Sequence, residues 1–154
     1  MRTRYVNKLQ RGITLIELLI VLVIIALIAS FAYPSYRNYV VDTKRTAAAS
    51  ILLQVADRQQ QFFMDNKRFA NDLTNLGFAN NPLVIADDGS VMANAASAAS
   101  VYSVSLSNVA ATTFTVTAAP LNAQAARDVD CGSLTLNQAQ LKGSSAGGGN
   151  DCWK

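Results

Sequence analysis

The sequence predicts an α+β protein in which one long N-terminal helix packs on a small antiparallel sheet, with a disulfide-closed loop at the C-terminal end. Three observations carry this prediction. No glycine occurs between Gly12 and Gly77, short alternating stretches rich in β-branched and aromatic residues follow residue 100, and two cysteines lie near the C-terminus. A helix packed on a sheet forms one α+β layer, and a chain of 154 residues fits one such domain.

The first part of the predicted helix is a membrane segment. Residues 18–29 are an unbroken apolar run, and within residues 13–32 only Thr14, Glu17 and Ser30 are polar. A helix of about 20 apolar residues spans the ~30 Å hydrocarbon core of a bilayer. We therefore assign residues 13–35 to a transmembrane segment and residues 36–154 to a globular domain.

The charges predict the orientation of this segment. Four of the 13 Lys and Arg residues precede the apolar run, and no acid accompanies them: Arg2, Arg4, Lys8 and Arg11. A basic head stays on the cytoplasmic side, so the domain is expected in the periplasm. From residue 13 onward the chain carries 9 basic and 10 acidic residues, 9 − 10 = −1. Such a balance gives a nucleic-acid partner only weak support.

The same helix is expected to continue beyond the membrane segment. Apolar or small residues recur at spacings of three, four and seven: Tyr36, Val40, Thr43, Ala47, Ile51, Val55 and Phe62. This periodicity is typical of an amphipathic helix. One helix from about residue 13 to about residue 65 would be roughly 80 Å long at 1.5 Å per residue.

Pro34 is the predicted break in this helix. Proline cannot donate a hydrogen bond to the Ser30 carbonyl, and its ring crowds the preceding turn. We expect a bend or local unwinding near residues 30–34. The alternative is that the helix ends there, but the apolar periodicity continues on both sides of the proline.

The second half of the chain is expected to form the sheet. Residues 66–100 are rich in Asn, Asp and Gly, which predicts a loop. Residues 102–106, 112–117 and 131–136 are predicted strands, and residues 140–142 are a candidate for a fourth. Residues 143–150 are rich in Gly and Ser and are expected to be flexible.

The two cysteines, Cys131 and Cys152, are expected to form one disulfide, because an exported chain leaves the reducing compartment. Such a bond would contribute about 3 kcal/mol by the chain-entropy model. The alternative is two unrelated buried thiols. A zinc site is not expected, because two Cys and no His cannot supply four ligands.

The N-terminus allows three interpretations. An ordinary secretory signal peptide would use residues 30–32 as its small-residue cleavage site, but Glu17 inside the apolar run is costly for such a segment. A membrane anchor that is never cut is the second interpretation. The third follows from a family resemblance.

Residues 11–21, RGITLIELLIV, resemble the class III signal of type IV prepilins. The resemblance implies a leader of residues 1–12 that prepilin peptidase removes after Gly12, and an N-methylated mature N-terminus at Ile13. Glu17 then occupies the fifth mature position, where it would pair with an N-terminal amine during assembly. Pro34 stands where pilins commonly carry a helix-disrupting proline.

The resemblance continues downstream, where the chain is similar to the PilE-like minor pilins. Two stretches carry it: the spacing of Leu53, Ala56, Gln59 and Phe62, and the terminal segment from Cys131 to Cys152-Trp153. It implies the type IV pilin fold and a minor structural subunit of a type IV pilus, used in pilus assembly, twitching motility, adhesion or DNA uptake. The alternatives are a pseudopilin of type II secretion and a DNA-receptor pilin.

The implied partners are other pilin subunits, prepilin peptidase, the inner membrane and the pilus assembly platform. The subunit would sit in the inner membrane before assembly and on the cell surface in the pilus afterwards. No cofactor or metal is expected. An enzyme is not expected either, because the chain has no His and no phosphate-binding glycine loop with Lys.

Three short motifs have structural interpretations. The sequence Asp87-Asp88-Gly89 is expected to be a turn. The basic pairs at residues 44–45 and 67–68 are expected to lie on a solvated face, with DNA contact as the alternative. Trp153 is expected to pack under the terminal loop, with partner binding as the alternative.

Overall fold

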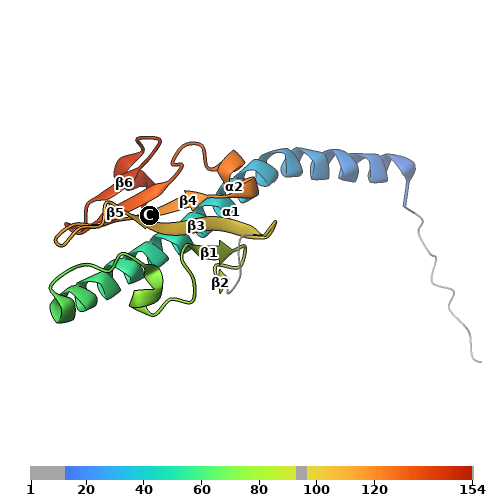
Figure 1. Ribbon diagram of the computed structural model, residues 1–154. Coiled ribbons are helices and arrows are strands. Elements are labelled where there is room, and N and C mark those ends of the chain that lie inside the picture. Colours follow the sequence, from blue (N-terminus) through green and yellow to red (C-terminus); the bar gives the residue numbers. More distant parts are fainter. Residues whose placement is uncertain (1–12, 93–96, 154) are drawn as a thin grey trace, which may run out of the picture. The chain divides into compact units, whose positions relative to one another are not determined.

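The structure is a computed structural model that describes residues 13–92 and 97–153. It divides into two compact units, Met1–Asn38 and Tyr39–Lys154. Helix α1, Leu15–Asn66, supplies nearly all of the described part of the first unit and the first element of the second (Figure 1). The predicted helix from about residue 13 to about residue 65 is confirmed.

Within the second unit, α1 buries one face. The buried residues recur every three or four positions and are Val41, Ala48, Ala49, Leu52, Val55, Ala56 and Gln59. The buried face is displaced by about one position from the predicted apolar face, since Thr43 of the predicted face is exposed while Ala48 is fully buried.

The end of α1 is fixed by backbone and side-chain hydrogen bonds. Lys67 adopts the left-handed conformation, with φ 56°, and its N–H donates to the Phe63 carbonyl over 2.8 Å. This is the hydrogen bond that commonly closes a helix. The buried Gln59 carboxamide then holds the returning chain, since it donates to the Ala70 carbonyl over 2.8 Å and accepts from the Ala70 N–H over 2.9 Å.

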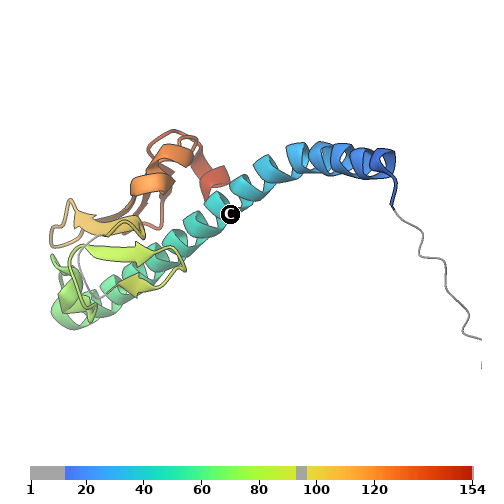
Figure 2. The same cartoon turned by 90° about the vertical axis from the view of Figure 1, so that its right-hand side faces the viewer.

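In the described residues, six strands form one sheet in the order β2-β1-β3-β4-β5-β6, and every neighbouring pair is antiparallel. In the second unit the sheet lies along α1 (Figures 1 and 2). The strands are β1 Leu83–Ala86, β2 Val91–Met92, β3 Ser100–Ser107, β4 Thr115–Pro120, β5 Leu134–Asn137 and β6 Lys142–Ser144.

Three predicted strands are present with shifted ends, and the candidate fourth is also a strand. The prediction of a loop throughout residues 66–100 was wrong, because β1, β2 and the 3-10 helix η1, Leu73–Leu76, lie in it. Strand β1 shows no alternation of apolar and polar residues, because Leu83, Val84 and Ile85 are all buried. The structure also adds α2, Asn122–Arg127, and a 3-10 helix η2, Gly149–Cys152.

The core lies between α1 and the sheet. Its largest fully buried side chains come from the helix, η1 and strands β1, β3, β4 and β5, and they include Leu52, Leu73, Leu83, Ile85, Tyr102, Phe114, Leu134 and Leu136. Phe69 connects two aromatic contacts: its ring stacks on Phe63 at 4.7 Å and meets Phe114 edge-on at 4.8 Å. Phe114 is fully buried although it precedes β4, so it packs from a loop.

The start of η1 is capped by Asp72. Its Oδ1 accepts hydrogen bonds from the Thr74 N–H over 2.8 Å and from the Thr74 hydroxyl over 2.7 Å. These hydrogen bonds favour the charged carboxylate and lower the pKa of Asp72 below its ordinary value.

Candidate functional site: the exposed helix and the closed terminal loop

Every described residue of the first unit is exposed, from Ile13 to Asn38. The large apolar side chains here are between 49% exposed at Val21 and 83% exposed at Leu15. An 18-residue window of this helix has a mean hydropathy of 3.0, which is sufficient for a membrane span. An apolar surface of this length needs a lipid or protein environment, because leaving it in water is unfavourable.

Glu17 is the acid within this apolar surface. It lies in the first turn of α1, and its N–H donates to the Thr14 hydroxyl oxygen over 3.2 Å. An acid in the first turn is stabilised by the helix dipole. Among the described residues no cation forms an ion pair with its carboxylate. The described residues therefore leave this carboxylate without an ionic partner.

Three other predicted site residues are Gly12, Ile13 and Pro34. Ile13 is the first described residue and is 75% exposed, whereas Gly12 and the predicted leader lie outside the described residues. Pro34 lies inside α1, and the backbone on both sides of it is α-helical. The helix therefore does not end at Pro34, and no unwound turn interrupts residues 30–34.

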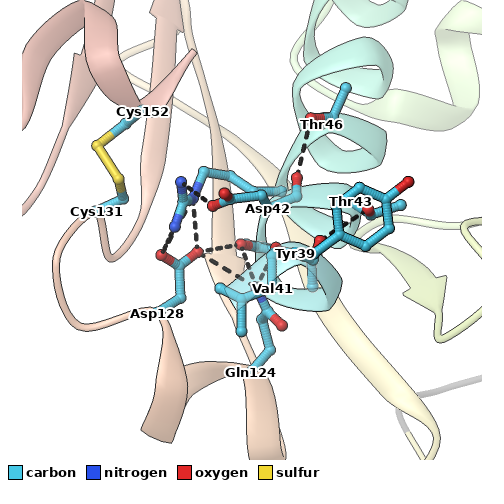
Figure 3. A network of polar contacts seen from close by, with 11 residues as sticks. Tyr39, Val41, Asp42, Thr43, Thr46, Gln124, Asp128, Cys131 and Cys152 are labelled. Carbon is cyan, nitrogen blue, oxygen red and sulfur yellow. Dashed lines mark hydrogen bonds and ion pairs between the residues drawn. A yellow bond between two sulfur atoms is a disulfide. The ribbon is translucent and has the colours of Figure 1, made fainter. Parts of the chain in front are cut away.

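The C-terminal loop is closed by a disulfide between Cys131 and Cys152, as predicted (Figure 3). Both cysteines are almost fully buried, and their Cα atoms are 5.6 Å apart. Trp153 packs against the core, and its indole N–H donates to the Gly143 carbonyl over 3.0 Å. The Lys142 ammonium lies 5.4 Å from the centre of the Trp153 ring. The chain end is thus attached to edge strand β6, which agrees with the predicted packing of Trp153.

A buried polar network lies beside this disulfide. The Arg45 guanidinium of α1 donates to both carboxylate oxygens of Asp128, from Nε over 3.1 Å and from a terminal nitrogen over 2.5 Å. It also donates to Asp42 over 3.0 Å. The Arg45–Asp128 hydrogen bond raises the pKa of Arg45. Asp128 immediately follows α2, so this pair attaches the base of the disulfide loop to α1.

Two neutral side chains complete the network (Figure 3). The Tyr102 hydroxyl donates to Asp128 over 2.5 Å, and burial together with this hydrogen bond raises the Tyr102 pKa. The Gln124 amide donates to the Val41 carbonyl over 3.2 Å and to the Tyr102 hydroxyl over 3.0 Å. Sequence reasoning missed Asp128 and Gln124. The available indication was weak: one acid following a short alanine-rich segment.

The two basic pairs differ in their surroundings. Lys44 forms an ion pair with Asp87, and Arg45 belongs to the buried network, so both cations of this pair are used inside the domain. Lys67 and Arg68 are exposed at the end of α1. The Lys67 ammonium donates to its own helix, at the Met64 carbonyl, over 2.9 Å.

Arg68 lines a pocket of about 380 Å³, and two amide side chains and two aromatic rings line it as well. The pocket is lined by Phe62, Arg68, Phe69, Ala70, Asn71, Asn75, Val109, Ala110 and Ala111. Among the described residues no acid pairs with Arg68. This depression therefore brings together an unpaired cation, two amides and two aromatic rings.

Asp87-Asp88-Gly89 forms the predicted turn, between β1 and β2. The Asp88 carboxylate accepts from the Ser90 N–H over 2.9 Å and from the Ser90 hydroxyl over 2.7 Å. These bonds lower the pKa of Asp88. The turn is therefore explained by its own hydrogen bonds.

Comparison with known proteins identifies three similarities. The family described as "Type IV minor pilin ComP, DNA uptake sequence receptor" matches residues 34–135, which is more than half of the chain. The family described as "Prokaryotic N-terminal methylation motif" matches residues 7–33. A "Type IV major pilin protein PilA" of Myxococcus xanthus (strain DK1622) is 34% identical over 79 residues, which cover 51% of this chain and 36% of that protein.

Proposed function

The chain belongs to the type IV minor pilin family described as ComP, DNA uptake sequence receptor, and from this premise we propose that it is a structural subunit of a type IV pilus. The exposed apolar helix is the observation that carries the proposal, because a filament subunit needs a surface that its own fold leaves uncovered. The similarities are to type IV pilus proteins, which favours this function over a pseudopilin of type II secretion. Its work is structural rather than enzymatic.

Processing prepares the subunit in this proposal. Prepilin peptidase cuts after Gly12 and leaves a positive amine at Ile13, which is then N-methylated. The match of the methylation motif to residues 7–33 supports this step. The apolar helix holds the mature subunit in the inner membrane until the assembly platform transfers it to the filament. Pro34 lies inside α1 and cannot donate a backbone hydrogen bond, so it is the proposed position of a helix break.

Glu17 would supply the specific contact of assembly. Within an apolar filament, its carboxylate would pair with an N-terminal amine, its own or a neighbour's. At 4 Å and an effective dielectric constant of ~20 this attraction is about 4 kcal/mol before desolvation. No cation of the described residues pairs with Glu17, so its carboxylate is available for such an amine.

The test is the substitution Glu17→Gln in the full chain, since it keeps the size of the side chain and removes its charge. Membrane insertion and cleavage after Gly12 should persist, while incorporation into sheared filaments should fall by about tenfold or more, given an attraction of about 4 kcal/mol. Ser30→Ala is the control, because it removes a polar group from the same exposed helix without changing charge. Native incorporation of Glu17→Gln subunits would refute the ion-pair assignment.

Intact-mass analysis tests the processing step separately. The membrane-extracted protein should begin at Ile13 and carry one additional methyl group. A chain that begins at Tyr33 would instead identify ordinary signal-peptidase cleavage and contradict the assembly proposal.

DNA binding is the second candidate function, and similarity to a family described as a DNA uptake sequence receptor favours it. If the domain contacts DNA, we propose that Lys67 and Arg68 supply the phosphate contacts, since the cations at residues 44–45 already pair with acids of the domain. The pocket beside Arg68 would offer amide donors at Asn71 and Asn75 next to these contacts.

The measurement is the salt dependence of DNA binding by the detergent-solubilised full chain. The double variant Lys67→Gln/Arg68→Gln should lose affinity, and its plot of log affinity against log salt should become shallower by about two units, since each phosphate contact contributes about 0.9. Arg127→Gln, which removes another exposed cation, is the control. A parallel plot for the double variant would rule out these two residues.

A further inference from the structure

Two tyrosines stand at the outer end of the apolar segment in the first unit. Tyr33 is 65% exposed and Tyr36 is 67% exposed. They are three residues apart on α1, so their side chains are neighbours on the helix surface. Among the described residues of this unit, neither ring packs against another aromatic ring. Their exposure therefore has no explanation within the unit itself.

A cation accompanies these rings. The Arg37 guanidinium lies 5.8 Å from the centre of the Tyr33 ring, one helical turn away. No acid of the described residues forms an ion pair with Arg37. A cation that lacks an acidic partner and lies beside amphipathic rings is suited to phosphate groups, which guanidinium binds by charge-assisted hydrogen bonds.

The position of this group matches the thickness of a bilayer. Tyr33 follows Ile13 by 20 residues, which is ~30 Å along a helix and equals the hydrocarbon thickness. Tyr36 and Arg37 lie ~5–6 Å further, within the ~5–7 Å headgroup layer on one side. When the amine end of Ile13 lies at the inner interface, the tyrosines and the arginine lie at the outer one.

We propose that Tyr33, Tyr36 and Arg37 form an interfacial belt that binds phospholipid headgroups of the outer leaflet and fixes the depth of the helix in the membrane. Tyrosine is suited to this layer because its ring is apolar and its hydroxyl is polar. The occupant is the phospholipid interface, since the belt continues directly from the apolar span.

The belt becomes more important for membrane depth once the leader is removed. This part of the inference rests on the proposed cleavage after Gly12. The leader carries the four cations that precede the span. Their removal takes away the basic anchor on the cytoplasmic side. The belt is then the remaining polar group at the outer end of the span, and it keeps the unassembled subunit at one depth in the membrane.

Single introduced cysteines can measure this depth. The two native cysteines are joined, so a cysteine placed in the helix is the one free thiol. The full chain in spheroplast membranes would carry Ser30→Cys or Asn38→Cys and be treated from outside with a membrane-impermeant maleimide. Cysteine at position 38 should react several-fold faster than cysteine at position 30, which lies inside the hydrocarbon. Equal reaction at the two positions would overturn the proposed boundary.

Variants of the rings then test the role of the belt. The pair Tyr33→Leu/Tyr36→Leu extends the apolar run, so the helix should sink and the labelling of Asn38→Cys should fall several-fold. The pair Tyr33→Trp/Tyr36→Trp should keep the native rate, because tryptophan also prefers the interface. Phe31→Leu, an exposed aromatic within the hydrocarbon, is the control and should change nothing.

Unchanged labelling in the leucine pair would overturn the depth-fixing role. The same would follow if the tryptophan pair behaved like the leucine pair, since the residues would then act through a contact specific to tyrosine, such as one with a neighbouring subunit. Labelling is measured on subunits that are still in the membrane. A failure of filament assembly or DNA binding therefore leaves this test intact.

Discussion

Helix α1 contains two regions that differ in whether the protein's own fold covers their apolar side chains. In the first unit every described side chain is exposed, whereas in the second unit the helix buries seven residues against its own domain. Composition alone does not explain the difference, because Leu22 is 58% exposed and Leu52 is fully buried on the same helix. The difference teaches that apolar surface in this chain serves two purposes, folding of the domain and association with something outside it.

The charged groups show the same contrast. Glu17 has no ion-pair partner among the described residues, while Asp128 is buried and paired with Arg45. A buried carboxylate needs its partner for the domain to fold, since an uncompensated buried charge is strongly destabilising. Substitutions in the second unit should therefore change stability, and substitutions in the first unit should change association.

The largest effect on domain stability is expected for Arg45→Met. It leaves the Asp128 carboxylate buried without its cation, which should cost about 3–5 kcal/mol of unfolding free energy. Urea unfolding of the solubilised full chain, followed by circular dichroism, measures the loss. The double variant Arg45→Met/Asp128→Leu should recover part of it, because the buried charge is then absent. A single variant as stable as the native protein would contradict the importance of this pair.

A matched leucine pair compares the two regions directly. Leu52→Ala creates a cavity in the core and should cost about 2–5 kcal/mol. Leu22→Ala removes the same atoms from an exposed position and should leave the unfolding free energy of the domain unchanged. Both are measured by the same urea titration. Equal losses would show that the first unit contributes to domain stability after all.

The disulfide should have the next effect. Replacing Cys131 and Cys152 together by Ser should lower the unfolding free energy by about 2–4 kcal/mol, mainly because the unfolded chain gains freedom. Thiol labelling of the native protein without reductant should find no free cysteine. If the double variant unfolds at the native urea concentration, the hydrogen bond from Trp153 to Gly143 suffices to hold the chain end.

The smallest effect is expected at Asp72, whose hydrogen bonds with Thr74 lower its pKa below the ordinary 3.8. The folded carboxyl binds protons more weakly than the unfolded one. Its contribution to stability is therefore present above the unfolded pKa and is lost as pH falls through the folded pKa. NMR titration should give an Asp72 pKa below 3.8, and Asp72→Asn should show a weaker loss of stability in acid.

The sequence alone determined the features that depend on neighbouring residues. The absence of glycine between Gly12 and Gly77 and the continuous apolar periodicity determined the long helix. The apolar run with one acid indicated the membrane segment and Glu17, and the cysteine pair in an exported chain indicated the disulfide. These properties follow from local periodicity and composition, so one chain carries the information for them.

Only the tertiary structure decided the features that depend on distant partners. Arg45 meets Asp128 across 83 positions in the sequence, and nothing near either residue indicates the other. Strand β1 has a buried residue at three consecutive positions, so no alternation distinguishes it from a loop until its neighbours β2 and β3 are known. The tertiary structure also decided which basic pair is left without acidic partners in the described part of the chain. Lys44 gains its ion-pair partner only when the β1–β2 turn brings Asp87 to it.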